Sequence, residues 1–254
     1  MRKFFFFVVF VFVFLYFVGC NRENLDLENE VSNVEVESVC FDEEVSGVNV
    51  GYAYVDLGLS VKWATCNVGA NSVMEYGDYF AWGETEPKGV YDCQAYKWSV
   101  YGKGPWYDKL IKYCNDTAYG GGEYFDYKTI LDIEDDAACV NWGGDWRMPT
   151  KEEVEELVMS CKCQYVLRKD TCGNSVYGYR VTGVNGNSIF FPTAGFMSGS
   201  TLRGSALWGN YWSSSLSLDM PGNAYFCFFN SGSMIWSVYD RQCGFTIRPI
   251  FPPY

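Results

Sequence analysis

The chemistry open to this chain is limited by the absence of histidine from its 254 residues. Without imidazole there is no Ser-His-Asp or Cys-His arrangement to activate a nucleophile, and the commonest general base is missing as well. Carboxylates and thiols are the remaining reactive groups. Two groupings of them lie close together in the sequence: the carboxylates Asp132, Glu134, Asp135 and Asp136, and the thiols Cys161, Cys163 and Cys172.

Each grouping has a structural explanation beside a functional one. The carboxylate oxygens would suit calcium, but acids at the start of a helix are explained equally well by the helix dipole. Structural zinc prefers two residues between its cysteines and four ligands in all, whereas one residue separates Cys161 from Cys163. A disulfide or buried thiols are therefore favoured there. The sequence predicts no catalytic residue, no metal and no cofactor, with calcium at the carboxylates as the open alternative.

The start of the chain has the pattern of an export signal. Two basic residues precede an apolar run, residues 4–18, that is shorter than the roughly 20 residues a membrane-spanning helix needs. The run Phe17-Val18-Gly19-Cys20 resembles the lipobox of bacterial lipoproteins, in which cleavage before the cysteine leaves it to carry lipid. We therefore expect a signal peptide over residues 1–19 and a lipid on Cys20 that anchors the protein to the outer membrane or cell surface. Secretion after cleavage near Gly19, without a lipid, is the alternative.

Residues 20–50 are expected to form an acidic tether. They hold nine acids against one arginine, and such a segment buries too little apolar surface to offset the entropy lost on ordering it. Its acidic character resembles the export signal of surface-displayed lipoproteins. The alternating Val34-Glu35-Val36-Glu37 is also compatible with a short edge strand. From Gly51 the composition changes to Gly, Trp and Tyr, so we place the start of one main domain, residues 51–254, at that point.

Charge and composition narrow the expected partners. The formal net charge is −12, and nucleic acids and anionic lipid headgroups are bound through positive patches, so neither is expected. Eleven cysteines in an exported protein predict disulfides, although the sequence does not determine their pairing. The many tryptophans could stack on sugar rings, but a loop-rich domain also needs large aromatic side chains inside. We expect most of them to be core.

Two helices are expected beside the reactive groups. Residues 134–140 predict a short helix that begins at acidic residues. The clearer helix begins at Thr150, which forms a capping-box pattern with Glu153. Apolar residues then recur with helical spacing, at Val154, Leu157, Val158 and Cys161. The acids on its opposite face are better explained as solvated surface than as an acid/base pair.

The remaining elements are expected to be short strands and long loops. Residues 54–64 predict a first strand with a glycine break, and residues 74–85 and 91–127 predict long loops. Residues 177–182 and 188–191 flank Asn185-Gly186, a pair that favours a type I′ turn, and therefore predict a hairpin. The chain as a whole predicts an α+β domain with two helices, short antiparallel strands and long ordered loops.

The stretch Leu207 to Pro249 holds the least ordinary mixture of residues. Two apolar runs, residues 224–230 and 233–239, flank Ser231-Gly232, a pair expected to take the positive φ of a tight hairpin turn. Alternation along a strand would place Tyr225, Cys227 and Phe229 on one face and the residues between them on the other. One face could then serve the core and the other a ligand.

Several motifs together resemble a known domain family. They are VDLGLSVKWAT at residues 55–65, GDYFAWGET at 77–85, WRMPT at 146–150, YWSSS at 211–215 and GFTIRP at 244–249. In this order they look like the Fibrobacter-succinogenes-type major paralogous domain, which is related to the formylglycine-generating-enzyme branch of the C-type lectin-like fold. The resemblance implies that the first and last strands pair, with residues 61–63 beside 245–247. The close cysteine pair that performs oxidation in the enzymes has no counterpart before Gly244, so no catalytic activity is implied.

The C-terminal stretch resembles something narrower, the variable region of C-type-lectin-like proteins that are diversified by retroelements. The resemblance implies a fixed framework and variable positions that contact a ligand, with Trp236 partly support and partly contact. A fixed member of the paralogous family, whose hairpin drifted neutrally, is the alternative. The implied ligand-binding positions are Phe226, Phe228, Ser233, Ile235, Trp236, Ser237, Val238, Tyr239, Asp240, Gln242 and Cys243.

These observations predict a surface-anchored lipoprotein that binds a ligand without catalysis. The ligand would be a protein or a carbohydrate, captured by the C-terminal hairpin. A carbohydrate-binding or structural surface module without diversification is the second interpretation. An oxidase related to the formylglycine generators is the third.

Overall fold

The computed structural model describes residues 38–39, 45–101, 107–114, 116, 119, 126–170 and 172–253. The expected signal peptide, Cys20 and most of the expected tether, Val34–Glu37 included, lie outside these residues. Within the described part of the chain, no helix has the length and apolar character that crossing a membrane requires.

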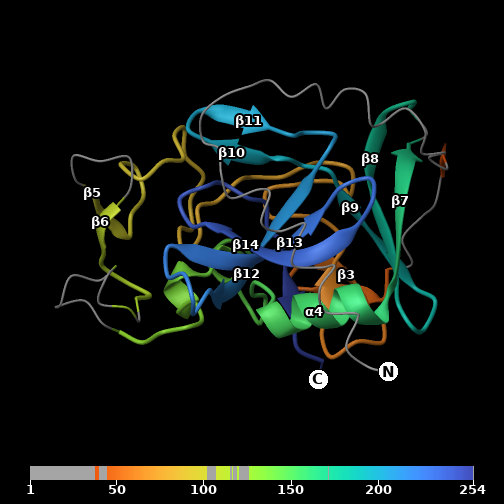
Figure 1. Ribbon diagram of the computed structural model, residues 1–254. Helices are drawn as coiled ribbons and strands as arrows, with labels where there is room; N and C mark the ends of the chain where they lie inside the picture. The colour runs from red at the N-terminus through yellow and green to blue at the C-terminus, as the bar shows by residue number, and fades with distance from the viewer. Residues whose placement is uncertain are drawn as a thin grey trace, which may run out of the picture. The chain divides into compact units, whose positions relative to one another are not determined.

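The described residues form an α+β structure of small, mostly antiparallel sheets with two α-helices, as the sequence predicts (Figure 1). Long connections separate the elements: residues 65–98, for example, contain neither a helix nor a strand. Trp82, Trp146 and Trp212 are fully buried, which confirms their expected role in the core.

One sheet joins segments from the start and the end of the described chain. Its strand order is β15 (Ile250–Phe251), β4 (Lys62–Ala64), β3 (Tyr52–Val55) and β2 (Gly47–Asn49), and all pairs are antiparallel. Because β2 precedes Gly51, this sheet begins upstream of the change in composition.

Two expectations about this sheet are wrong. Residues 54–64 are not one interrupted strand, because the chain reverses near Gly58, which has a φ of 73°, and Val55 pairs with Trp63. The first and last strands do pair, but the segment opposite Trp63 is Ile250 and not residues 245–247. Phe245 instead forms a bridge to Phe80.

A second sheet has the order β1 (Ser38–Val39), β7 (Lys162–Lys169), β8 (Ser175–Thr182) and β9 (Ser188–Pro192). The predicted β8–β9 hairpin is present, but its turn is not type I′. Gly186 has a φ of 92° whereas Asn185 does not have a positive φ, and the Gly186 N–H donates to the Gly183 carbonyl. This is a type I turn followed by a left-handed glycine, the next most common hairpin connection.

Among the described residues there are two small two-stranded sheets, of which the first lies within the predicted loop of residues 91–127. They are formed by β5 (Ser99–Tyr101) with β6 (Tyr107–Leu110), and by β10 (Phe196–Ser198) with β11 (Thr201–Arg203). Figure 1 shows the β10–β11 pair above the C-terminal strands.

The predicted helix over residues 134–140 is interrupted. A 3₁₀ turn, η4 (Ile133–Asp135), is followed by α3 (Ala137–Trp142), with Asp136 between them. The Asp136 carboxylate accepts hydrogen bonds from the backbone N–H groups of Ala138 and Cys139, so it caps α3 in place of continuing one helix.

The second predicted helix, α4 (Lys151–Ser160), is confirmed together with its capping box. The Thr150 hydroxyl accepts from the Glu153 N–H, and the Glu153 carboxylate accepts from the Thr150 N–H at 2.7 Å. Val154 and Leu157 are buried, as the apolar spacing predicts.

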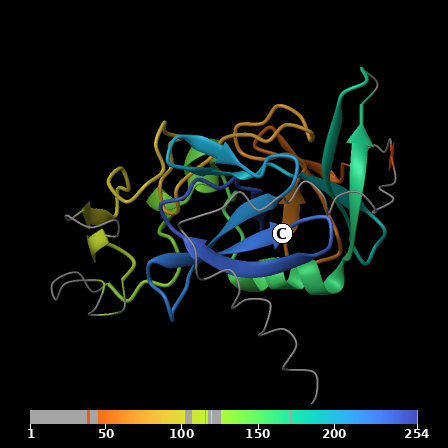
Figure 2. The ribbon, with the colours of Figure 1, turned by 45° about the horizontal axis from the view of Figure 1, so that its top comes forward.

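The C-terminal sheet consists of β12 (Gly209–Leu216), β13 (Asn223–Phe229) and β14 (Met234–Asp240), with β13 in the middle. Figure 2 shows α4 lying along this sheet. One face of β13 packs with α4 through Cys227 and Phe229, and the other packs with Trp212 and Phe245. The sheet therefore separates the two main hydrophobic clusters.

Two buried arginines fasten the long loops to this framework. Arg248 donates to the backbone carbonyls of Ala64, Thr65 and Phe190. Arg241 is equally buried, and its guanidinium lies 4.7 Å from the centre of the Trp82 ring. Such contacts explain how long loops stay ordered in a compact domain.

Candidate ligand-binding hairpin

The hairpin turn at residues 230–233 is built by an asparagine side chain. Asn230 Oδ1 accepts hydrogen bonds from the N–H groups of Gly232 and Ser233, at 2.9 and 3.1 Å. Neither Ser231 nor Gly232 has a positive φ, so the expectation of a turn based on left-handed backbone is wrong. An Asx turn achieves the reversal without it.

The predicted hairpin strands are present, and their side chains alternate as expected. Phe226 packs against Phe245 at 4.9 Å between ring centroids, whereas Tyr225 lies on the opposite face, 5.9 Å from Trp236. The division into a core face and a ligand face does not hold for β13, however. As the middle strand of the sheet it is covered on both faces, and exposure is concentrated on β14.

β14 carries three large exposed side chains. Ile235 is 43% exposed, and Trp236 and Tyr239 are each 38% exposed. Ser233 is exposed at the start of the strand, while Phe228, Ser237, Val238 and Asp240 are half-buried. These residues lie along one strand, with Ile235 and Tyr239 on one face of the sheet and Trp236 on the other, and we call them together the β14 surface.

Three of the predicted ligand contacts are buried instead. Phe226, Gln242 and Cys243 are 4%, 8% and 5% exposed, so they do not contact a ligand directly. Phe226 belongs to the middle strand. Gln242 and Cys243 follow the point where the chain turns into the core, because the Cys243 N–H donates to the Asp240 carbonyl.

The buried anchor of this turn is Arg241. Its Nε donates to the Tyr96 hydroxyl at 2.8 Å, and its Nη1 donates to the carbonyls of Tyr113 and Pro221. Its backbone carbonyl accepts from the Trp82 N–H. The end of β14 is therefore fixed by contacts to three separate loops.

Three aromatic rings pack against the Tyr239 ring. Its ring lies 5.5 Å from Phe196, 5.4 Å from Phe245 and 6.1 Å from Phe226. Phe196 also stacks with Trp208. Phe196 and Trp208 were not expected at the site, because no local pattern connects them with a strand so much later in the sequence.

On the other face of the sheet, Trp236 is held by α4. Lys151 Nζ lies 4.7 Å from the Trp236 ring centroid and 5.1 Å from the Tyr225 ring centroid. Lys151 also pairs with Glu155, one helical turn later, at 4.0 Å. Neither Lys151 nor Tyr225 was among the predicted contacts, so both were missed as neighbours of the site.

Among the predicted contacts, Asp240 has a carboxyl whose pKa is shifted. Burial raises the pKa of its carboxyl, and a hydrogen bond with Gln242 opposes that rise. The shift follows from the position of Asp240 where the strand leaves the surface.

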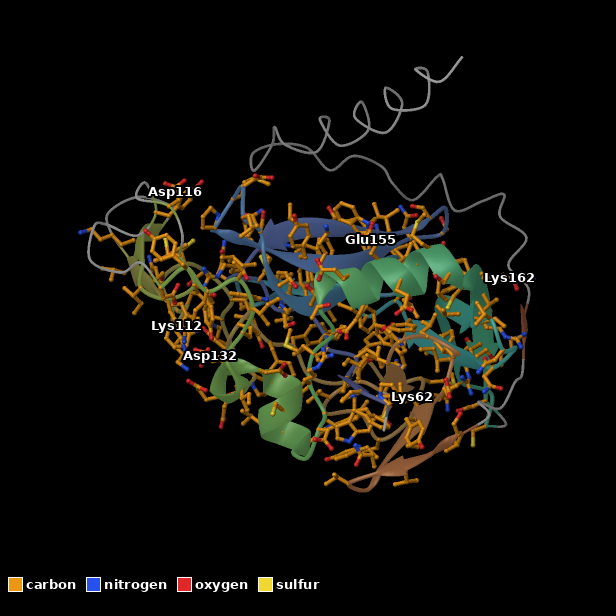
Figure 3. All side chains as sticks on the ribbon, turned by 90° about the horizontal axis from the view of Figure 1, so that it is seen from below. Lys62, Lys112, Asp116, Asp132, Glu155 and Lys162 are labelled. Atoms are coloured by element: carbon orange, nitrogen blue, oxygen red, sulfur yellow. The ribbon has the colours of Figure 1, made fainter. Side chains whose placement is uncertain are left out.

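Lysine side chains form ion pairs with carboxylates of the grouping at residues 132–136. Lys112 Nζ lies 2.7 Å from Asp132 and 2.5 Å from Asp135. Figure 3 shows Lys112 beside Asp132. Lys128 also pairs with Asp132, and Asp136 caps α3. These contacts favour the structural explanation over calcium, and no group of three or more metal-ligating side chains occurs among the described residues.

The thiol grouping is explained by burial. Cys161 and Cys163 pack against the cluster beneath α4 and are not joined by a disulfide. Burial raises the pKa of Cys161 to about 12 and of Cys163 to about 11. Both are therefore unreactive thiols at neutral pH, which agrees with the buried-thiol alternative. Cys172 is exposed and apart from them.

Comparison of the chain with family models, with curated proteins and with solved structures found no match.

Proposed function

We propose that this protein is a surface-anchored binding protein that captures a protein ligand on the β14 surface and does not act by catalysis. One observation carries the proposal: Ile235, Trp236 and Tyr239 are exposed on one strand although each is large and apolar. Aromatic side chains of this kind dominate the energetics of binding interfaces. Because the framework beneath them is buried and hydrogen-bonded, little entropy would be lost on binding.

The anchor and fold proposed are those that the sequence implies. Lipid on Cys20 would hold the chain at the outer membrane or cell surface. The residues between Cys20 and β1 would act as a spacer, since β1 and β2, which fall within the expected tether, are paired in sheets. The fold proposed is the C-type lectin-like fold of the paralogous domain. The pairing of β4 with β15 and the long loops pinned by Arg241 and Arg248 support it.

Diversification by a retroelement would act on the exposed positions of β14. The positions compatible with variation are Ser233, Ile235, Ser237, Val238, Tyr239 and Asp240, with Phe228 at the margin and Trp236 as a framework position. A near-copy of the final coding segment that differs at adenines, beside a reverse transcriptase gene, is the expected observation. If the flanking DNA has no such copy, the hairpin belongs to a fixed binding module.

The binding function is tested by selecting ligands from a displayed library of small protein domains against the immobilised chain. We expect selected binders to lose at least tenfold in affinity for an Ile235→Ala/Tyr239→Ala variant. Val184→Ala, an exposed apolar change in the turn between β8 and β9, is the matched control and should leave affinity unchanged. Selected binders that are indifferent to the β14 changes would refute the proposal.

A further inference from the structure

β14 is an edge strand with one side open. It pairs with β13 along seven residues and has no second partner strand among the described residues. A strand at a sheet edge presents a row of backbone donors and acceptors that can template another strand. The edge of β14 therefore offers more than the side chains of the β14 surface.

The direction of the backbone groups follows from the hydrogen bonds at the two ends of the hairpin. The Asn230 N–H donates to the Ser233 carbonyl, and the Arg241 N–H donates to the Gly222 carbonyl. Hydrogen-bonded pairs alternate with non-hydrogen-bonded pairs in an antiparallel ladder. The N–H and C=O groups of Met234, Trp236 and Val238 consequently point away from β13, and no hydrogen bond from elsewhere in the described chain reaches them.

Three common protections of an edge strand are missing from β14. Natural edges are shielded by lysine, proline or a β-bulge. The sequence Met234–Asp240 contains neither lysine nor proline. Its pairing with β13 runs without a bulge from Phe229 opposite Met234 to Asn223 opposite Asp240. The strand is thus regular enough to accept a partner over its whole length.

Side chains border this edge on both faces of the sheet. On one face, Lys151, Glu155 and Met159 form a stripe along α4, since residues four apart lie on the same side of a helix. Lys151 contacts the Trp236 ring, and Figure 3 shows Glu155 on the side of α4 that borders the dark-blue strands. On the other face stand Ile235 and Tyr239.

We propose that β14 binds an extended segment of another protein, which adds to the sheet as a fourth strand. This inference rests on the proposed function and names its ligand class. The segment would place apolar side chains beside Ile235 and Tyr239, and neutral or basic ones beside Glu155. Charge disfavours a second copy, because each chain carries a net charge of −12, and it disfavours the chain's own acidic residues 20–50.

The test uses a phage-displayed library of random twelve-residue peptides selected against the full chain, with the enriched peptide synthesised as the probe. Val238→Pro removes one outward N–H, which an edge strand tolerates. We expect it to weaken peptide binding at least tenfold. Ser231→Pro, in the turn of the same hairpin, should leave binding unchanged. On binding, the amides of Trp236 and Val238 should gain protection from hydrogen exchange.

Four outcomes would overturn the inference. Peptide binding that is lost in Tyr239→Ala but unchanged in Val238→Pro would retain the proposed function and exclude strand addition. Failure of any peptide to enrich would exclude it as well, while the protein-domain selection still tests the proposed function. If the chain associates with itself and Val238→Pro abolishes that association, the edge binds a second copy of the chain. Should Val238→Pro not fold, methylation of alternate peptide nitrogens replaces it, and unchanged binding in both methylation registers would refute pairing.

Discussion

At the scale of single residues, burial separates the predicted contacts into two groups. The ring centroids of Tyr239 and Phe226 are 6.1 Å apart, and both residues were expected to contact a ligand. Tyr239 is 38% exposed, however, whereas Phe226 is 4% exposed. The difference follows from the strands they belong to, because β13 is covered on both faces and β14 has an open edge.

Phe226→Ala should therefore be costly for stability. Removing a buried phenylalanine leaves a cavity between Trp212 and Phe245, and such changes cost about 3 to 5 kcal/mol. Urea unfolding would measure the loss. Ser233→Ala, at an exposed position, is the control and should change the free energy of unfolding by less than about 0.5 kcal/mol. Equal effects of the two changes would contradict the assignment of Phe226 to the core.

Asp240 predicts a dependence of stability on pH. Its pKa is raised in the folded protein by burial, so the folded state binds this proton more tightly than the unfolded chain does. The proton on Asp240 stabilises the folded state below pH 3.8, the ordinary pKa of the carboxyl. This stabilisation is lost as the pH rises through the raised pKa. Asp240→Asn should therefore raise the melting temperature at pH 7, and this gain should shrink as the pH is lowered toward 4. A gain that is independent of pH would contradict the role of burial.

At the scale of elements, α4 positions one side of the candidate site. Its first residue, Lys151, packs on Trp236, so the start of the helix and the β14 surface are coupled. The capping box at Thr150 fixes where the helix begins.

Thr150→Ala should lower stability by about 1 kcal/mol, since it removes the N-cap hydrogen bond of α4. Thermal unfolding would show the loss. Glu152→Gln, on the same helix turn but outside the capping box, should have little effect. If Thr150→Ala changes the thermal stability as little as this control does, the start of α4 does not depend on its cap.

Local elements were predictable because their signals lie within a few residues. The capping box at Thr150 and Glu153 and the strands on either side of residues 230–233 could be read directly from the sequence. The turn was misjudged because Asn230, counted as part of a strand, supplies the hydrogen-bond acceptor. The burial of Phe226 and the pairing of Trp63 with Ile250 depend on distant segments, which periodicity does not reveal.

At the scale of the whole molecule, buried polar anchors replace regular secondary structure as the means of ordering long loops. Arg241 contacts the loop carbonyls of Tyr113 and Pro221 and the Tyr96 hydroxyl, and these groups come from three different parts of the chain. The position of the β14 surface relative to the domain depends on this residue.

Arg241→Met should destabilise the protein by about 2 to 5 kcal/mol, because it leaves several buried carbonyls without donors. Arg203→Met, an exposed change on β11, is the matched control. Urea unfolding should separate the two. Similar midpoints for both variants would show that the loops are held by other contacts.

The central claim is that a rigid framework carries a surface on β14 that tolerates changes in side chain. The most direct measurement is protease resistance of a displayed library in which positions 226, 235, 236, 239 and 241 are randomised one at a time. We predict that folded chains accept nearly all residue types at 235, 236 and 239, and few at 226 and 241. Restriction at 235, 236 and 239 equal to that at 226 would contradict the claim.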